Sequence, residues 1–445
     1  MFSAYSVGIA KHIFISFHRN HQHCLQNSLF RSVSMNNQRE VESETESHVH
    51  YNHTDPSEYA RWTARESFQF MYARPWQRVN DFYFNVVRAN LSLSLLFGPQ
   101  TILDHNDTGI AALSDQSELE SVASEDRSGR WARRTFKIIL SYHGGSFDGW
   151  QKQPGLNTVQ GIVEASLGKF VDEKKTQLLK DKGLPIEGCA VVAGRTDKGV
   201  TGLQQVCSFY TWKKDVKPRD IEDAINQAAL GKLRVISVSE VSRVFHPNFS
   251  AKWRHYLYIF PLTNGYRDQS NSNGESCDIS KYNEMHDSSS KDGIENQEKS
   301  YLFSVSKVNV LLRKLEGKLL SYKMFARDTK ASRNDGPPTE CFVYHARAME
   351  VKLPTTVSAS HDCGEETKVM CVELVANRFL RKMVRVLVAT SIREAAAGAE
   401  DDALIKLMDA TCRRATAPPA PPDGLCLVDV GYTEFDPQKC FILIE

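Results

Sequence analysis

The order of the predicted strands and helices indicates an α+β fold with two halves. Across residues 135–241 the patterns predict strand, helix, strand, strand, helix and strand, which is the order of a ferredoxin-like or RRM-like unit. A second set of helical and alternating patterns begins near residue 305. The chain has 445 residues, of which 41% are hydrophobic, so it can bury a substantial core.

The first half opens with a strand and a long helix. Residues 135–142 alternate well enough to predict a strand. Asn157 or Thr158 can cap a helix that begins at Val159 and continues to about Lys180. We expect one face of this helix to be buried, formed by Ile162, Val163, Ala165, Leu167 and Phe170.

The remaining elements of this half are shorter. Residues 189–192 form an apolar run that predicts a buried strand, and residues 205–210 predict a second strand paired with it. A helix is predicted over residues 218–230 and a strand over residues 233–241. These elements complete the six-element order of the first half.

Residues 256–262, at the end of the first half, read as a strand. The second half repeats the alternation of helix and strand, and it begins with a helix predicted over residues 305–319. Strands are predicted over residues 342–353 and 369–376. A helix is predicted to begin at Asn377, which can cap it.

Changes in composition divide the chain into five parts. They are a transit segment (1–39), a linker with an aromatic and basic extension (40–130), two halves of one catalytic domain (131–262 and 301–445) and an insert (263–300). The insert is rich in Ser, Asn, Asp and Gly, so we expect a disordered loop that catalysis does not need.

Residues 1–39 contain no Asp or Glu and carry scattered basic residues among Ser, His and apolar residues. Such a composition is typical of an organellar transit peptide, so we expect a mitochondrial or chloroplast protein. A tail without targeting function is the alternative, and it would leave the protein in the cytoplasm or nucleus. Met35 offers an alternative start that would lack the presequence.

Aromatic and arginine residues interleave over residues 61–98. Such a stretch can stack on and neutralise RNA. It can equally be an amphipathic helical element that packs on the core, which is the interpretation we favour.

Charge and cysteine usage exclude several classes of protein. The formal net charge is +1, so an RNA-binding surface would have to be a local basic face. The ten cysteines form no C-x-x-C pair and no zinc-like cluster, which argues against a structural metal and a disulfide framework. No apolar run reaches the length of a membrane span.

The stretch Ala193–Val200 holds the first candidate catalytic group. It follows the apolar strand, and two glycines bracket Arg195, Thr196 and Asp197. A loop at a strand end is where catalytic side chains tend to lie. A surface turn with a solvated Arg–Asp pair is the alternative.

AGRTDKGV, at residues 193–200, resembles the AGRTDxGV signature of the TruA-type tRNA pseudouridine synthases. The resemblance implies that Asp197 is the nucleophile. Arg195 beside it becomes a substrate-binding candidate that fills the space left by the uridine or holds phosphates.

Two segments on either side of this signature also resemble the family. His143–Gln151 resembles YDGxxFxGWQ, although His143 stands where Asp is usual. Phe245–Ile259 resembles FHxRFSAxxRxYxYxI, with Asn248 in place of a basic residue. The family pattern implies that Tyr256 lies against the target uracil.

Two further segments lie near the carboxyl end. Asn377–Arg385 resembles NxFLxxMVR, which implies that Arg385 pairs with Asp197. Arg381, four residues earlier, would share its helix face and is a second basic candidate for substrate binding. The Pro-rich stretch 417–432 resembles APPxGLxLxxVxY, which makes Leu425 a candidate for the uracil pocket.

The resemblance covers about residues 135–435. Together with the element order it implies two ferredoxin-like, RRM-like halves that form one mainly antiparallel sheet flanked by helices, with the active-site cleft between them. It implies isomerisation of uridine to pseudouridine in tRNA, on the 3′ side of the anticodon arm. No cofactor and no metal are needed, because nothing is oxidised and no group is imported. The partners implied are tRNA and a second copy in a homodimer, with no membrane.

Two other functions remain open at this stage. A catalytically silent RNA-binding or chaperone protein could use the same fold, but it would not need Asp197, Tyr256 and Arg385 together. A glycosidase would need a second carboxylate about 5–9 Å from Asp197. No acidic residue stands out in sequence for that role.

Overall fold

A computed structural model describes residues 57–98, 133–183, 187–262, 299–327, 338–354, 367–410 and 412–443. The transit segment predicted over residues 1–39 lies outside the described residues, as does nearly all of the insert predicted over residues 263–300. No helix among the described residues is long and apolar enough to cross a membrane.

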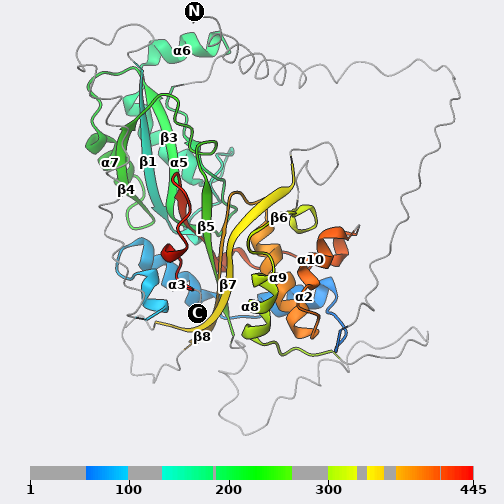
Figure 1. Ribbon diagram of the computed structural model, residues 1–445. Coiled ribbons are helices and arrows are strands. Elements are labelled where there is room, and N and C mark those ends of the chain that lie inside the picture. Colours follow the sequence, from blue (N-terminus) through cyan, green and yellow to red (C-terminus); the bar gives the residue numbers. More distant parts are fainter. Residues whose placement is uncertain are drawn as a thin grey trace, which may run out of the picture. The chain divides into compact units, whose positions relative to one another are not determined.

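The described part of the chain forms one nine-stranded sheet, which confirms the predicted α+β fold (Figure 1). The strand order is β4-β1-β3-β9-β5-β8-β7-β6, with β2 paired to β3. All pairings are antiparallel except that of β3 with β9. The strands are β1 (Arg134–Tyr142), β2 (Val191–Val192), β3 (Thr201–Thr211), β4 (Leu233–Val241), β5 (Trp253–Pro261), β6 (Lys318–Ser321), β7 (Glu340–Leu353), β8 (Thr367–Ala376) and β9 (Leu425–Gly431).

Helices flank this sheet. The α-helices described are α2 (Ala64–Tyr72), α3 (Trp76–Val87), α5 (Val159–Leu167), α6 (Glu173–Asp181), α7 (Pro218–Asn226), α8 (Val305–Arg313), α9 (Met383–Ala396) and α10 (Ala403–Lys406). Short 3-10 helices are η1 (Leu93–Leu96), η6 (Gly144–Ser146), η7 (Gly168–Phe170), η10 (Lys323–Phe325), η12 (Leu407–Asp409), η13 (Arg413–Ala415), η14 (Pro422–Gly424) and η15 (Pro437–Lys439).

The first half has the ferredoxin-like order β4-β1-β3-β2, as its sequence predicts. Helices α5 and α7 bury their apolar faces against β1, β3 and β4. In the sheet β5 lies between β9 and β8, so we count it with the second half. The two halves then join where β3 meets β9 in parallel, with Thr201 opposite Cys426 and Gly202 opposite Leu427.

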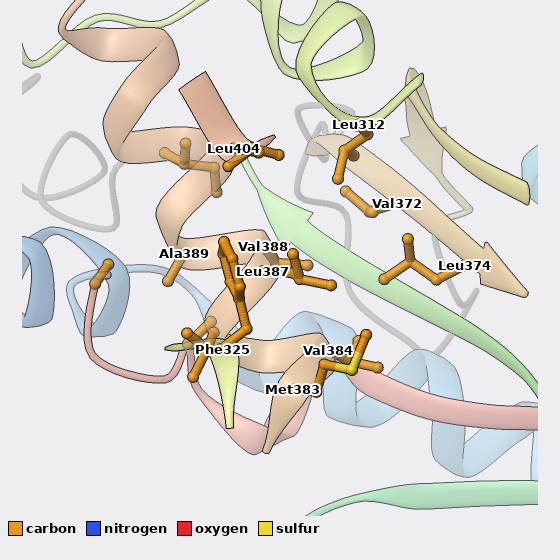
Figure 2. Close-up of a cluster of buried hydrophobic side chains, with 14 of the residues drawn as sticks. Leu312, Phe325, Val372, Leu374, Met383, Val384, Leu387, Val388, Ala389 and Leu404 are labelled. Carbon is orange, nitrogen blue, oxygen red and sulfur yellow. The ribbon is translucent and has the colours of Figure 1, made fainter. Parts of the chain in front are cut away.

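Helix α9 is the centre of the second half, and every residue from Met383 to Ala396 is buried. Figure 2 shows its apolar side chains gathered with residues of β8, α8, α10 and η10. This packing fixes the first turn of α9 rigidly against the sheet, which matters because Arg385 lies there. The partners labelled in the figure are Leu312, Phe325, Val372, Leu374 and Leu404.

The stretch 61–98 is helical and packs on the core, which confirms the interpretation favoured from the sequence. Thr63 caps α2 in a capping box with Glu66. In α3, Val79, Phe82 and Tyr83 are buried against the sheet face formed by alternate residues of β5, β8 and β9. The extension is therefore part of the folded body.

The long helix predicted from Val159 to Lys180 is wrong in its length. Helix α5 ends at Leu167, and a second helix begins after Asp172, whose side chain accepts a hydrogen bond from the Lys175 N–H. The break follows from burial, because α5 buries one face whereas α6 buries no residue. The cap of α5 is Thr158, which accepts from the Gly161 N–H at 3.2 Å.

Other predicted helices are also shorter than expected. Helix α8 ends at Arg313, and residues 318–321 form β6, after a turn at Gly317 with φ +68°. Helix α7 ends at Asn226. Residues 318 and 319 belong to the antiparallel strand β6, whereas residues 227–230 form a turn that leads to β4.

The helix predicted to begin at Asn377 begins at Met383. Asn377 instead extends the pairing of β8 with β7. Its N–H donates to the Phe342 carbonyl at 3.0 Å, and its side-chain oxygen accepts from the Phe342 N–H at 2.9 Å. The chain then turns into α9 at Lys382, which has the left-handed φ of 61°.

A buried carboxylate holds the carboxyl-terminal segment to the sheet. Glu373 of β8 is fully buried and accepts from the backbone N–H groups of Phe441 and Ile442, at 2.8 and 2.7 Å. The Nε2 atoms of His255 and His345 lie 2.7 and 3.1 Å from its oxygens. Burial alone would raise the pKa of Glu373, but the two imidazoles outweigh it and hold the pKa well below its ordinary 4.5.

We expect Glu373→Gln to lower the free energy of unfolding by about 3 kcal/mol at pH 7, measured by urea denaturation. An amide has one acceptor oxygen, so one of the two backbone donors would lose its partner. Because the folded pKa is depressed, the stabilisation by Glu373 is present above pH 4.5 and is lost as the pH falls. The variant should therefore lose less stability than the wild type between pH 7 and pH 4.

Glu350→Gln is the matched control on the neighbouring strand. Glu350 is exposed and paired with Lys368, so its replacement should change the stability by less than about 0.5 kcal/mol. Equal losses for the two variants would contradict the assignment to Glu373.

Candidate active site

Asp197 lies on the loop between β2 and β3, at the place where the two halves of the sheet meet. Its carbonyl accepts from the Val200 N–H at 3.2 Å, which closes a tight turn before β3. Its side chain is 31% exposed, so the carboxylate is accessible to a ligand while the loop around it is packed.

Arg385 of α9 reaches this carboxylate from the other half. Its Nη1 lies 3.3 Å from Asp197 Oδ2, and its side chain is only 10% exposed. Its Nε donates to the Ala420 carbonyl at 2.6 Å, and the Ala420 N–H donates back to the Arg385 carbonyl at 3.1 Å. The guanidinium is therefore held in place by the backbone while one end points at Asp197.

Residues of the first half hold the Asp197 loop in place by hydrogen bonds. The Thr196 hydroxyl lies 2.8 Å from the Tyr142 hydroxyl, and the Trp150 N–H donates to the Thr196 carbonyl at 3.1 Å. Gln205 donates to the Gly194 carbonyl at 2.8 Å and to the Tyr142 hydroxyl at 3.3 Å. This network places the residues on either side of Arg195 in one conformation.

Two glycines allow the close packing of this loop. A Cβ on Gly144 would lie 2.4 Å from the Gly199 carbonyl oxygen, so no larger residue fits there without moving the loop. Gly199 itself has φ +84°, a left-handed conformation that favours glycine.

Tyr256 projects from β5 beside this pair. Its ring meets Phe379 edge to face, with centroids 5.0 Å apart. The pKa of Tyr256 is raised to about 12, chiefly by burial, with Arg254 lowering it and the Asp197 carboxylate raising it. The phenol is therefore neutral at physiological pH and can pack or donate a hydrogen bond.

Leu425 begins β9, opposite Tyr258 of β5. It is 7% exposed and belongs to the apolar cluster around α9. Tyr256 lies on the same pair of strands, because it is opposite Leu427, two residues after Leu425. Its place in the uracil pocket stays a prediction.

The two arginines that are candidates for substrate binding differ from the buried Arg385. Arg195 and Arg381 are both exposed. Arg381 precedes α9, so the prediction that it shares a helix face with Arg385 is wrong. Its carbonyl accepts from the Arg327 N–H at 3.0 Å, which keeps residue 381 in an irregular segment.

Sequence reasoning missed Arg254, the buried residue that ties the surrounding segments together. Its guanidinium donates to the carbonyls of Ala193, Asn248 and Asn377, at 3.2, 3.0 and 2.8 Å. It is 8% exposed, and burial lowers its pKa. An arginine within an otherwise aromatic and apolar strand is the signal that could have identified it.

One group of described residues has the spacing of metal ligands. The ligand atoms of His345, Glu373 and Cys440 lie within 4.8 Å of one another. Both oxygens of Glu373 already accept backbone hydrogen bonds, so this group serves the packing of the carboxyl-terminal segment.

Comparisons with known proteins point to one family. A family model described as tRNA pseudouridine synthase matches residues 325–433, which include Arg385 and Leu425. A relative from Pelodictyon phaeoclathratiforme, named tRNA pseudouridine synthase A, is 27% identical over 301 residues, which are 67% of this chain and 100% of the relative.

Shorter and more similar matches carry the same name. The relative from Solibacter usitatus is 35% identical over 125 residues, and that from Brachyspira hyodysenteriae is 39% identical over 123 residues. Each match covers 28% of this chain, and the chain spans 46% and 44% of these two relatives, less than half of their length.

Proposed function

We propose that this chain, which belongs to the tRNA pseudouridine synthase family, isomerises uridine to pseudouridine in tRNA. The observation that carries the proposal is the contact of Asp197 with Arg385 across the junction of the two halves, beside the ring of Tyr256. A partly exposed carboxylate held by a buried arginine suits an active site better than a surface ion pair.

The reaction sets a role for each of these groups. The N1–C1′ bond of uridine breaks, the base turns, and a new bond forms between C5 and C1′. An ionised carboxylate can attack C1′ or C6, or act as a base, and Asp197 is the group we assign to that step. Arg385 holds this carboxylate in place through the 3.3 Å contact of its guanidinium.

Tyr256 has a role that follows from its protonation state. As a neutral phenol it packs against the uracil ring and offers its hydroxyl as a donor. The phenol does not act as a base for the C5 proton, because its pKa of about 12 keeps it protonated at physiological pH. The reaction itself requires neither a metal nor an organic cofactor.

The target uridine must leave the base stack of the RNA before it can reach Asp197. A uridine in a folded arm has to be extruded, which costs a few kcal/mol of unstacking. Arg195 and Arg381 are exposed near the site, and we assign them to the phosphates around the extruded nucleotide. The 3′ side of the anticodon arm is the proposed target, with a homodimer as the active form.

The direct test incubates the purified protein with tRNA transcripts and maps pseudouridine on the product. We expect conversion at one or more uridines of the anticodon arm. Mapping across the RNA of cells that lack the protein then identifies its natural targets. Absence of pseudouridine on every tRNA, with binding retained, would instead favour a silent RNA-binding protein.

We also propose that residues 1–39 direct the protein to mitochondria or plastids, because they lack acidic residues. A fusion of this segment to a fluorescent protein should enter an organelle, whereas the form initiated at Met35 should not. Diffuse signal from both fusions would reject the proposal.

A further inference from the structure

Helix α3 contacts both halves of the catalytic body close to their junction (Figure 1). Among the described residues, the strand pairing between the halves is a short parallel one, in which Thr201 and Gly202 of β3 lie opposite Cys426 and Leu427 of β9. So short a pairing leaves the relative position of the halves to contacts from other elements. Helix α3 belongs to the extension that the family resemblance does not cover.

Two contacts join α3 to the first half. The ring of Phe84 meets the His143 imidazole edge to face, with centroids 5.2 Å apart. Arg234 Nε donates to the Val87 carbonyl at 3.1 Å. His143 directly precedes Gly144, which packs against Gly199. Helix α3 is therefore linked to the Asp197 loop through His143 and Gly144.

Three hydrogen bonds join α3 to the second half. One runs from Arg78 to the Thr367 hydroxyl of β8, and the other two end on η14. The Tyr83 hydroxyl donates to the Gly424 carbonyl at 2.9 Å, and the Asn80 amide donates to the Asp423 carboxylate at 2.9 Å. Tyr83 is fully buried, so its hydroxyl has no water to replace the Gly424 carbonyl.

The η14 segment in turn contacts the loop that carries Asp197, and Ala420, two residues before η14, is hydrogen-bonded to Arg385. A Cβ on Gly199 would lie 3.0 Å from Pro422 Cγ, so Pro422 packs directly on the loop two residues beyond Asp197. Ala420 accepts a hydrogen bond from the Arg385 side chain and donates one to the Arg385 carbonyl. A displacement of η14 would therefore move Asp197 and Arg385 relative to each other.

We propose that α3 is a positioning element of the active site, and that Tyr83 and Asn80 are its positioning residues. They hold η14 so that the Asp197 loop and the Arg385 guanidinium keep their relative geometry. The inference rests on the proposed function for its catalytic consequence. Its structural part, the anchoring of η14 by α3, stands independently of turnover.

The test compares Tyr83→Phe, Asn80→Ala and the double variant with the wild type. We expect kcat for pseudouridine formation to fall roughly tenfold in the double variant, because a buried carbonyl loses its donor and the reacting groups lose their alignment. KM for tRNA should stay within about twofold, since neither residue is placed at the RNA surface. Amide hydrogen exchange should become faster over residues 420–427 and stay unchanged in β1.

Matched controls exist for both substitutions. Tyr322 is also fully buried, and its hydroxyl has no hydrogen-bond partner among the described residues, so Tyr322→Phe should alter neither kcat nor exchange. Asn85 lies on the same helix and donates only to the Asp81 carbonyl one turn away, so Asn85→Ala should leave turnover unchanged.

The readouts separate this proposal from the proposed function. A wild-type protein that forms no pseudouridine rejects the function, while the exchange experiment still tests the anchoring of η14. Wild-type kcat and exchange in the Tyr83 and Asn80 variants would overturn the inference. Faster exchange throughout the protein would also overturn it, because it would show a general loss of stability.

Discussion

Replacing Asp197 with Asn is expected to abolish uridine isomerisation in tRNA, lowering kcat by roughly four orders of magnitude or more. Asparagine keeps the size of the side chain and its fit to the loop, but it has no charge and is a poor nucleophile and base. The loop is held by Tyr142, Gln205 and Trp150 through neighbouring residues, so the variant should fold like the wild type.

Glu240→Gln is the matched control for this experiment. Glu240 forms a 2.7 Å ion pair with Arg134, and its side chain is 26% exposed, close to the 31% of Asp197. The control should keep full activity, since β4 carries no residue of the site. Turnover by the Asp197 variant within tenfold of the wild type would refute the nucleophile assignment, whereas RNA binding by filter retention should be preserved.

Local patterns predict much of this fold because strand alternation and glycine-bracketed turns are local signals. The strands predicted over residues 135–142 and 342–353 appear almost where expected, as β1 and β7. The loop Ala193–Val200 follows the short strand β2, which pairs with β3 as predicted. The prediction that this strand is buried is wrong, because Val191 is exposed and Val192 is half-buried. These features depend on residues within a few positions of one another.

Element ends are less predictable because partners far along the chain decide them. Asn377 looks like a helix cap, yet its backbone and side chain both pair with Phe342, 35 residues earlier. The side-chain pattern of α9 is equally misleading, since all of its residues are buried and no polar face marks its limits.

In the candidate site, too, local motifs are predictable from the sequence and long-range contacts are not. The motifs locate Asp197 and Arg385, but their spatial contact spans 188 positions and follows from the sheet order. The bond from Tyr83 to Gly424 spans 341 positions, and nothing in the aromatic stretch 61–98 indicates it. Arg254 is likewise identified only by the three carbonyls that surround it.

Arg385→Ala is expected to lower kcat by roughly three orders of magnitude, measured as pseudouridine formed per enzyme under saturating tRNA. The substitution removes the cation beside Asp197 and leaves the Ala420 carbonyl without its donor. Two effects therefore combine. Asp197 loses the cation beside it, and the segment that begins at Ala420 loses the hydrogen bond that holds it. Binding of tRNA should change little, because the guanidinium is 10% exposed.

Two further variants separate catalysis from structure. Arg385→Lys keeps the charge, but a single ammonium cannot serve both Ala420 and Asp197 in the geometry of the planar guanidinium, so intermediate activity is expected. Arg134→Ala is the structural control, because Arg134 also combines a carboxylate partner with backbone carbonyls, those of Lys214 and Val216. Both Ala variants should lose about 1–3 kcal/mol of stability in urea denaturation, and only Arg385→Ala should lose turnover. Equal loss of turnover in the two would mean that Arg385 acts through folding alone.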